Sequence, residues 1–312
     1  MLDGIKIIGL GKSCGDLVFK NDDFAKIIDT SDEWIRSKSG IRSRCFAKTK
    51  KNEDMAIEAA VSAIENAKIK PEDISVCIAA TFTADNSTPA LACSIAHGAG
   101  LSEEIVAFDL NGACSGFILA CSVARGLMMS GQGKYALVVG SEKISPFIDF
   151  EDRGSCVLFG DGAGAAVIEL CERDFQFYAG CRPNQEILKC DRKSGKISMA
   201  GQEVYRFAVS NVPMCIRKVM DNAGCTNDDI DYFVCHQANE RIIDNAARRI
   251  GSPEKFYKNL YTYGNTSAAS VPIALSEMNE KGMFSSQKEI VCTGFGAGLT
   301  YAAMKISVDI RK

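Results

Sequence analysis

The sequence predicts an α/β protein built from two related halves. Across its 312 residues, short apolar runs of strand length alternate with longer helix-like stretches, a pattern typical of α/β layers around buried central strands. Two features also occur twice and in the same order. An acidic turn that leads into an apolar strand is found at residues 71–80 and again at 227–236, and a glycine-rich turn that opens into a strand at 160–167 and again at 294–301. This repetition predicts an amino-terminal half, residues 1–168, and a carboxyl-terminal half, residues 169–312, of related topology.

The elements of each half follow from the spacing of the apolar residues. The spacing predicts helices at residues 55–67, 115–130, 204–223 and 240–250, and strands at 76–81, 105–110, 136–140 and 232–235. The helix at 115–130 is apolar on nearly every side, so we expect it to be buried between layers. No stretch rich in serine, glycine or proline separates the halves, which favours one shared core.

Composition and charge exclude several classes of protein. A chain of this length with 46% hydrophobic and 24% charged residues can bury a sizeable core. Its formal net charge of −3 disfavours a general nucleic-acid binder, which needs a basic surplus to neutralise phosphates. No apolar run approaches the roughly 18 to 20 residues of a membrane span, and the amino terminus has too short an apolar core for a secretion signal. The sequence therefore predicts a cytoplasmic enzyme that binds neither nucleic acid nor a membrane.

The 14 cysteines do not form a metal or redox motif. None stands in a C-x-x-C pair, and with only two histidines, His97 and His236, a histidine-rich metal centre is not expected. We interpret most of the cysteines as small core residues in a reducing compartment. His97 has no chemically suitable neighbour in sequence and is interpreted as a structural residue at a helix end.

One cysteine stands in a position that favours reactivity. Cys114 lies between the predicted strand at 105–110 and the predicted helix at 115–130. A helix N-terminus presents unpaired N–H groups and the positive end of the helix dipole, which lower the pKa of a nearby thiol. The sequence therefore makes Cys114 a candidate nucleophile, although a small core residue is the more common role of an isolated cysteine.

Two further residues strengthen that assignment. His236 directly follows a predicted strand, and the carboxyl end of a strand is a common place for reactive side chains in α/β proteins. Asn265 follows a glycine, in a segment that is also typical of a turn or of the start of a helix. When the two repeats are aligned, Cys114 corresponds to Ser270. In the same alignment His236 corresponds to Ala80. The three functional side chains thus come from equivalent strand-end regions of the two halves, and we expect them to meet in one cleft. A thiolate beside two hydrogen-bond donors suits thioester chemistry.

Five segments form an ordered set of motifs. They are Thr-Ser-Asp-Glu-Trp-Ile at 30–35 with Gly-Ile-Arg at 40–42, Ala-Cys-Ser-Gly-Phe at 113–117, Leu-Phe-Gly-Asp-Gly-Ala-Gly at 158–164, His-Gln-Ala-Asn at 236–239, and Gly-Asn-Thr-Ser-Ala-Ala-Ser-Val-Pro at 264–272. With these motifs the chain, from Ile5 to Ser307, resembles the β-ketoacyl-acyl carrier protein synthase III family of the thiolase superfamily. The resemblance implies a thiolase-like, five-layered αβαβα fold built from two related halves, and a homodimer.

The resemblance also implies a role for each candidate residue. Cys114 would be acylated by an acyl-coenzyme A (acyl-CoA), with acetyl-CoA as the expected donor, and malonyl-acyl carrier protein (malonyl-ACP) would then bind. His236 and Asn265 would hold the enolate formed by loss of carbon dioxide. That enolate would attack the acyl-Cys114 thioester in a Claisen condensation that initiates type II fatty acid biosynthesis. The backbone N–H groups of Cys114 and Ala297 would form the oxyanion hole. No metal or organic cofactor is required.

The coenzyme site is implied in the same way. Trp34 and Arg153 would hold the adenine between them, an arrangement favoured by stacking and cation–π attraction. Asn239 would hydrogen-bond the pantetheine arm. The chain departs from the family pattern at Gln202, where asparagine is common near the pantetheine, and at Lys38, where arginine is common near the coenzyme. Both changes keep the polarity of the site.

The acyl pocket and the carrier site complete the set. Thr88 stands where the family often has phenylalanine at the base of the acyl pocket, so this smaller residue is predicted to open a longer acyl channel. Four arginines are candidates for a patch that docks the acidic carrier protein: Arg206, Arg241, Arg248 and Arg249. Arg241 and Arg248 are seven residues apart and share a helix face, although a solvated helix face is an equally good interpretation of any one of them.

Four other interpretations are open at this point. The glycines at 9–15 suggest a dinucleotide-binding oxidoreductase, but Cys14 replaces the third glycine of that motif. A papain-like hydrolase shares the order Cys, His, Asn but not the sequence around the nucleophile. A condensing enzyme or acyltransferase of a specialised or longer-chain pathway has the same three residues. A non-catalytic scaffold of the same fold is the fourth, and the intact Cys114, His236 and Asn265 argue against it.

Overall fold

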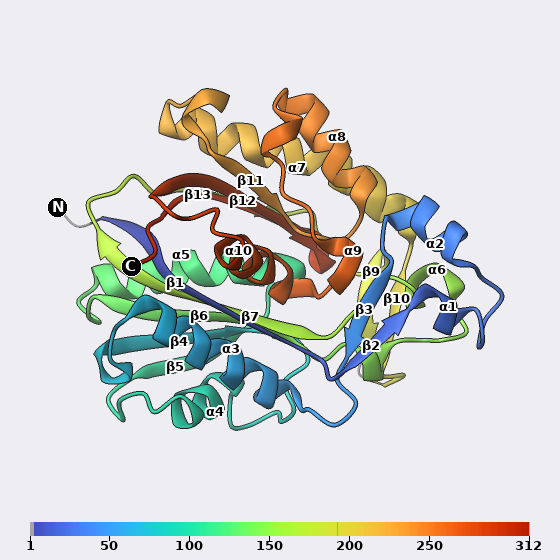
Figure 1. Cartoon of the computed structure of the whole chain (residues 1–312), viewed down its shortest axis with the longest axis horizontal. Coiled ribbons are helices and arrows are strands. Elements are labelled where there is room, and N and C mark those ends of the chain that lie inside the picture. The colour runs from blue at the N-terminus through green and yellow to red at the C-terminus, as the bar shows by residue number, and fades with distance from the viewer. Residues whose placement is uncertain (1–2, 192, 312) are drawn as a thin grey trace.

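The computed structural model describes residues 3–191 and 193–311 and arranges them in five layers (Figure 1). Two layers are β-sheet. A layer of helices lies between the sheets, and a further layer of helices covers the outer face of each sheet (Figure 1). This is the five-layered αβαβα arrangement that the family resemblance implies. Among the described residues, no helix is both long enough and apolar enough to cross a membrane.

The strands of both layers belong to one continuous nine-stranded sheet, in which β1 pairs with β13. The part of it that forms the first layer, called the first sheet, has the strand order β1-β7-β6-β4-β5. Its strands are β1 (Gly4–Cys14), β4 (Ile74–Ala80), β5 (Val106–Leu110), β6 (Tyr135–Glu142) and β7 (Gly162–Cys171). Helices α3 (Asn52–Ala67) and α4 (Leu91–Gly98) cover its outer face. The glycines of β1 allow α3 to approach closely, because a Cβ at Gly9 or Gly11 would lie 2.3 or 2.2 Å from a backbone oxygen of α3. These glycines are therefore inside a paired strand and do not form a phosphate-binding turn, which removes the oxidoreductase interpretation.

The second sheet repeats the topology of the first. Its strand order is β8-β13-β12-β11, with β8 (Gln176–Cys181), β11 (Tyr232–Cys235), β12 (Lys288–Gly296) and β13 (Thr300–Val308). In each sheet the first two pairings are antiparallel and the third is parallel. Helices α7 (Gly201–Ala223) and α8 (Glu240–Ile250) cover the outer face. The predicted relation between the halves is thus confirmed, while their division at residue 168 stays a prediction.

The central layer consists of α5 (Gly116–Met129) and α10 (Ser270–Glu280). Both pack in one hydrophobic core with residues of the two sheets. The sheets also hydrogen-bond to each other where β1 and β13 run parallel, with Lys6 opposite Ser307. Helix α5 is buried between layers as predicted, except at its outer side, where Val123 is 38% and Met129 44% exposed.

The two central helices begin in the same unusual way. Each follows a short 3₁₀ turn, η2 (Ala113–Ser115) before α5 and η6 (Ser267–Ala269) before α10. The first residue of each turn has a positive φ, 47° at Ala113 and 50° at Ser267. The equivalence of the turns pairs Cys114 with Ala268, so the expected pairing with Ser270 is wrong by two residues. The strand ends agree with expectation, since Ala80 ends β4 and His236 directly follows β11.

Smaller elements gather at one end of the molecule (Figure 1). They are two hairpins, β2 (Leu17–Lys20) with β3 (Ser43–Phe46) and β9 (Leu188–Asp191) with β10 (Lys196–Met199), and the short helices α1 (Asn21–Phe24), α2 (Asp32–Ser39), α6 (Arg153–Cys156) and α9 (Leu260–Tyr263). A separate apolar cluster joins several of them, with Phe24, Phe46 and Ile197 among its buried members.

Most predicted elements begin and end within three residues of their expected bounds. The prediction of 240–250 matches α8, and that of 115–130 exceeds α5 by one residue at each end. His97 lies in the last turn of α4 and is exposed, in agreement with its interpretation as a residue at a helix end.

Candidate active site

Cys114 lies at the strand-to-helix junction that the sequence predicts. It is the middle residue of η2, after β5 and two residues before α5. The preceding residue, Ala113, has a φ of 47°, a region that residues with a Cβ rarely occupy. Backbone of this kind is concentrated at functional sites, where the surrounding structure holds it in place. Local geometry therefore supports a functional role for this turn.

The Cys114 thiol faces a cavity of about 480 Å³, a size in the range of ligand pockets. Ala297, the first residue of the turn η7 (Ala297–Leu299), also lines it. The remaining lining is largely apolar and comes from segments that are far apart in sequence. These include Phe82, Ile144, Phe147, Phe159, Leu188 and Ile197. The site is thus an apolar chamber with a thiol in its wall.

His236 is fixed next to β12. Its backbone N–H donates to Thr293 O at 2.7 Å, and its ring packs edge-on against Phe295 with centroids 5.3 Å apart. The side chain is buried, and Nδ1 has no hydrogen-bond partner among the described residues. Burial lowers the pKa of His236 to about 3, so the imidazole is neutral at physiological pH.

Asn265 is held from both sides. Its backbone N–H donates to Leu158 O at 2.8 Å, and its carbonyl accepts from Gly160 N at 3.0 Å. Its side-chain Oδ1 accepts from the backbone N–H of Ser267 at 2.9 Å. The Asn265 side chain is therefore tied to the turn η6, which packs against the Cys114 turn η2.

The strand β12 and the turn η6 each connect the Cys114 turn with one of the other two predicted residues. Beyond Thr293, which holds His236, β12 passes the nucleophile so closely that a Cβ built on Gly296 would lie 2.7 Å from Cys114 N. On the other side, Ser267 lines the same cavity as Cys114 and holds Asn265. Strand β12 and turn η6 thus link His236 and Asn265 to the Cys114 turn, but neither residue is among those that line the cavity in the described part of the chain, so the convergence of the three side chains stays a prediction.

The predicted acidity of Cys114 is not found. Burial raises the pKa of its thiol to about 12, and the Ser267 hydroxyl only partly opposes this effect. The helix N-terminus was expected to lower the pKa, but removal of the thiol from water outweighs it, because a buried thiolate loses its hydration. The thiol therefore needs a base before it can act as a nucleophile.

The predicted coenzyme residues lie outside the cavity and contact each other. Arg153 Cζ lies 4.1 Å from the centre of the Trp34 ring, a direct cation–π contact. The resemblance implies an adenine between the two side chains, and in this arrangement no space for one remains between them. Arg153 is exposed, and its Nη1 also lies 3.9 Å from Asp29 Oδ2, so its guanidinium makes surface contacts.

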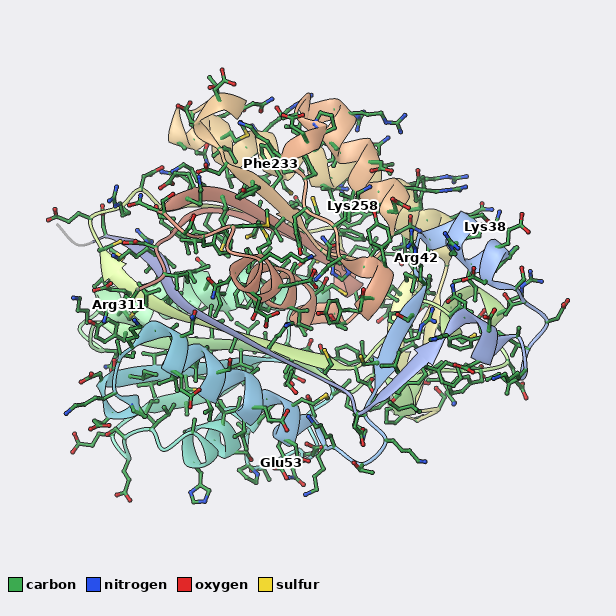
Figure 2. The ribbon with its side chains drawn as sticks, in the orientation of Figure 1. Lys38, Arg42, Glu53, Phe233, Lys258 and Arg311 are labelled. Carbon is green, nitrogen blue, oxygen red and sulfur yellow. The ribbon has the colours of Figure 1, made fainter. Side chains whose placement is uncertain are left out.

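Asn239 and Lys38 meet at the contact between α2 and α8. Asn239 caps α8, with Oδ1 accepting from Arg241 N at 2.9 Å, and its Nδ2 donates to Lys38 O at 3.0 Å. The Lys38 side chain is exposed at this edge of the molecule (Figure 2). Gln202, the second residue of α7, is exposed as well.

Thr88 is exposed and is not among the residues that line the cavity in the described chain. Its neighbour Ser87 does line the cavity. The segment that carries Thr88 therefore borders the chamber, while Thr88 itself is exposed to solvent.

Two of the four predicted docking arginines share a second cavity. Arg241 and Arg248, with Tyr205 and Lys258, line a space of about 690 Å³ between α7 and α8. Lys258, labelled in Figure 2, forms ion pairs of 3.0 Å with both Glu240 and Asp244.

The other two arginines lie apart from this cavity. Arg249 points to α7, where its Nη1 donates to Val209 O at 2.8 Å. Arg206 is exposed on α7 and does not line the space.

Sequence reasoning missed two polar residues beside the nucleophile. Ser267 and Glu142 are both nearly inaccessible to solvent, and both act on Cys114. Ser267 stood inside a recognised motif, so its presence near Asn265 was available from the sequence. Glu142 ends β6 with no local signal, and only the tertiary structure places it at the site.

Three comparisons match this chain with proteins of known family. Models of 3-oxoacyl-[acyl-carrier-protein] synthase III match residues 108–180, and of the C-terminal part of that enzyme residues 220–308. The β-ketoacyl-[acyl-carrier-protein] synthase III of Clostridium acetobutylicum is 42% identical, over 97% of this chain and 98% of that protein. Its counterpart from Acholeplasma laidlawii is 44% identical over the same shares. The crystal structure of 3-oxoacyl-[acyl-carrier-protein] synthase III from Aquifex aeolicus VF5 superposes with a TM-score of 0.93, at 39% identity over 97% of this chain and 99% of that one.

Proposed function

The chain belongs to the β-ketoacyl-[acyl-carrier-protein] synthase III family, and we propose that it condenses an acyl-CoA with malonyl-ACP to give 3-oxoacyl-ACP, the initiating step of type II fatty acid biosynthesis. The observation that carries the proposal is the apolar cavity of about 480 Å³ that has Cys114 in its wall. An acyl group transferred to this thiol would occupy an apolar space without losing any hydrogen bond.

The arrangement suits two consecutive reactions at one site. In the first, the Cys114 sulfur attacks the acyl-CoA carbonyl, and the coenzyme thiolate leaves. The backbone N–H groups of Cys114 and Ala297, both at the cavity, would stabilise the oxyanion. In the second, malonyl-ACP loses carbon dioxide and the resulting enolate attacks the acyl-Cys114 carbonyl, which releases the Cys114 thiolate.

His236 and Asn265 would stabilise the enolate as hydrogen-bond donors. A histidine whose pKa is about 3 is neutral, so it donates a hydrogen bond without transferring its proton. The Asn265 amide is oriented for this role by the bond from Ser267 N to its Oδ1, which leaves Nδ2 as the free donor. The chemistry proposed here uses no metal and no organic cofactor.

The coenzyme and carrier sites extend this proposal to the surface. Adenine would enter by displacing Arg153 from the Trp34 ring, since the two now touch. Lys38, Asn239 and Gln202 would line the path of the pantetheine arm.

The carrier protein would dock at the cavity lined by Arg241 and Arg248. Arg206 is exposed near this cavity and could add to the docking surface, whereas Arg249 is already bound to α7.

A homodimer and a cytoplasmic location are also part of the proposal. The strand β5 is the free edge of the first sheet, and all five of its residues are only partly buried. Beside it, α5 exposes Val123 and Met129. A second copy of the chain would cover this apolar edge and would place the segment with Thr88 at a subunit boundary. Molar mass by light scattering tests the dimer, and a monomer at micromolar concentration would contradict it.

Intact-protein mass spectrometry tests the function directly. The protein is incubated with acetyl-, isobutyryl- or octanoyl-CoA, alongside the variant Cys114→Ala and the matched control Cys181→Ala, which replaces an exposed cysteine. We expect one acyl group on the wild type and on the control and none on Cys114→Ala. Absence of an adduct with every donor would overturn the proposal. The preferred donor also tests the Thr88 prediction, because strict acetyl preference contradicts a longer acyl channel.

Charge reversal tests the carrier site separately. The double variant Arg241→Glu, Arg248→Glu should raise the KM for malonyl-ACP on the order of 10-fold, since it reverses the attraction for an acidic partner. Acylation by acetyl-CoA should be unchanged. Arg249→Ala is the control, because its guanidinium is bound to α7. An equal effect of both variants would contradict a docking site at this cavity.

A further inference from the structure

Two aromatic residues of the chamber wall come from segments that meet at the end of β6. Phe82 lines the cavity from the segment that follows β4, and Phe147 lines it from the turn η3 (Ser145–Phe147), which follows β6. The two rings lie next to each other, with centroids 6.4 Å apart and an angle of 54° between their planes. The position of these two segments therefore contributes to the size of the space that an acyl chain can occupy.

Glu142, the last residue of β6, holds the first of these segments with a single oxygen. Its Oε2 accepts hydrogen bonds from three consecutive residues: from Thr81 Oγ1 at 3.2 Å, from Phe82 N at 3.3 Å and from Thr83 Oγ1 at 2.5 Å. The middle one of these residues carries the ring in the chamber wall. The carboxyl group therefore fixes the point at which the Phe82 side chain leaves the backbone.

The backbone of Glu142 leads directly into the second segment. Lys143 N donates to Thr83 Oγ1 at 2.9 Å, which adds a further bond between the two segments. The next residue, Ile144, lines the cavity, and its N–H donates to the buried carboxyl of Asp161 at 2.7 Å. Glu142 thus connects two parts of the chamber wall, one through its side chain and the other through its backbone.

The second oxygen of the Glu142 carboxyl takes no part in these contacts. Oε1 has no hydrogen-bond partner among the described residues, although the side chain is inaccessible to solvent. A buried polar atom without a partner costs free energy, so the retention of a carboxyl here requires an explanation. Because Oε2 makes all three contacts, a glutamine could keep them with its amide oxygen and place its amide nitrogen where Oε1 lies.

We propose that Glu142 is a positioning residue for acyl-chain selection: through Oε2 it keeps Phe82 in its place in the chamber wall, and this ring limits the length of the acyl group that Cys114 accepts. The inference rests on the proposed function, because the chamber selects a chain only if the thiol receives one. Glu142 makes no contact with the acyl group in this role. Phe82 makes the contact, and Glu142 acts through it.

A purely structural role for Glu142 is the competing explanation, and four variants separate the two. Phe82→Ala removes the ring, Glu142→Ala removes its anchor, and Glu142→Gln keeps the size and one acceptor oxygen. Glu169→Ala is the matched control. Glu169 is a second buried glutamate, on the neighbouring strand β7, but it pairs with Lys6 and Lys134 and is not among the described residues that line the cavity.

The experiment measures single-turnover acylation of each variant by acetyl-CoA and by octanoyl-CoA, read by intact mass, together with the thermal midpoint. The readout is the ratio of the octanoyl to the acetyl rate constant. Phe82→Ala should raise this ratio on the order of 10-fold, the usual effect of a change in the size of an apolar pocket. Glu142→Ala should raise it by a similar factor, and Glu142→Gln should keep the wild-type ratio. Glu169→Ala should lower the midpoint and leave the ratio unchanged.

A double variant tests whether Glu142 acts through Phe82. In the Phe82→Ala background, Glu142→Ala should have no further effect on the ratio, because two changes that remove the same contact are not additive. Independent effects of the two substitutions would overturn the inference. An unchanged ratio in Glu142→Ala, with both rates lowered equally, would also overturn it, in favour of the structural role.

Two further outcomes are separated by the same measurements. If Glu142→Ala fails to fold, Thr83→Val removes one hydrogen bond to Oε2 at nearly constant shape and should shift the ratio in the same direction. A folded Thr83→Val with the wild-type ratio would then overturn the inference. A wild type that forms no acyl adduct with either donor would overturn the proposed function and this inference with it, whereas adducts with an unchanged ratio overturn the inference alone.

Discussion

A single methyl group at Gly296 should displace the nucleophile. The φ of Gly296 is −167°, an extended conformation that any residue adopts, so alanine meets no backbone strain there. Its Cβ would, however, lie 2.7 Å from Cys114 N, 3.0 Å from Cys114 Cβ and 3.3 Å from Ala113 Cβ. Carbon atoms in contact normally lie about 3.5–4.0 Å apart. Gly296→Ala therefore pushes the Cys114 turn away from β12 by roughly 0.5–1 Å.

The cost should be much larger for acylation than for folding. Overpacking in a core typically costs about 1–3 kcal/mol of unfolding free energy, whereas a misplacement of about 1 Å at a reacting group can cost on the order of 10²-fold in rate. Both donors of the proposed oxyanion hole are involved, because Cys114 is displaced and Ala297 adjoins the substituted residue. We expect Gly296→Ala to fold and to acylate at least 10²-fold more slowly.

The assay is single-turnover acylation by acetyl-CoA, read by intact mass, with urea unfolding in parallel. Gly126→Ala is the matched control: it lies in α5, the helix that follows the nucleophile, and an added Cβ meets nothing within 4 Å. This control should acylate at the wild-type rate and gain up to about 1 kcal/mol in stability, since alanine replaces glycine in a helix. A folded Gly296→Ala that acylates at the wild-type rate would refute the reasoning.

Three further predictions concern separate parts of the molecule. His236 has a pKa of about 3 in the folded state, whereas the unfolded chain binds a proton on this histidine below about pH 6.5, so the contribution of His236 to stability is full above pH 6.5 and falls as the pH drops towards 3. His236→Asn should therefore flatten the pH dependence of the unfolding free energy in urea titrations. An unchanged slope would show that the imidazole is not buried and neutral. Trp34→Ala should raise the KM for acetyl-CoA on the order of 10-fold while leaving decarboxylation of malonyl-ACP unchanged, and equal loss of both would place Trp34 in the core instead of the coenzyme site. Arg44→Met should cost at least about 2 kcal/mol of unfolding free energy, because the fully buried guanidinium donates hydrogen bonds to Asn21 Oδ1 and Val157 O. A loss below experimental error would mean that water replaces the guanidinium as the donor to these two oxygens.

The sequence was sufficient for features that depend on neighbouring residues. Apolar periodicity gave α8 its bounds, and the repeated turns anticipated two sheets of matching strand order. The motifs around Cys114, His236 and Asn265 identified three residues that β12 and η6 connect through the Cys114 turn. The alignment of the two repeats was less reliable for single residues. It made Cys114 equivalent to Ser270, whereas the turns η2 and η6 make Cys114 equivalent to Ala268. Insertions between the halves change the spacing while the order of elements stays the same.

The local sequence determined where Cys114 stands in the chain, and only the tertiary structure decided its chemistry. A strand-to-helix junction is encoded by residues 105–130, but the environment of the thiol comes from distant, largely apolar segments. Burial by these segments raises the Cys114 pKa instead of lowering it, and it brings in Glu142, which no nearby motif marks. The sequence predicted that Arg153 and Trp34 hold an adenine between them, but it did not predict that the two side chains touch each other. Desolvation and side-chain contact depend on what the whole fold packs around a group, so neither can be read from the residues adjacent to it in sequence.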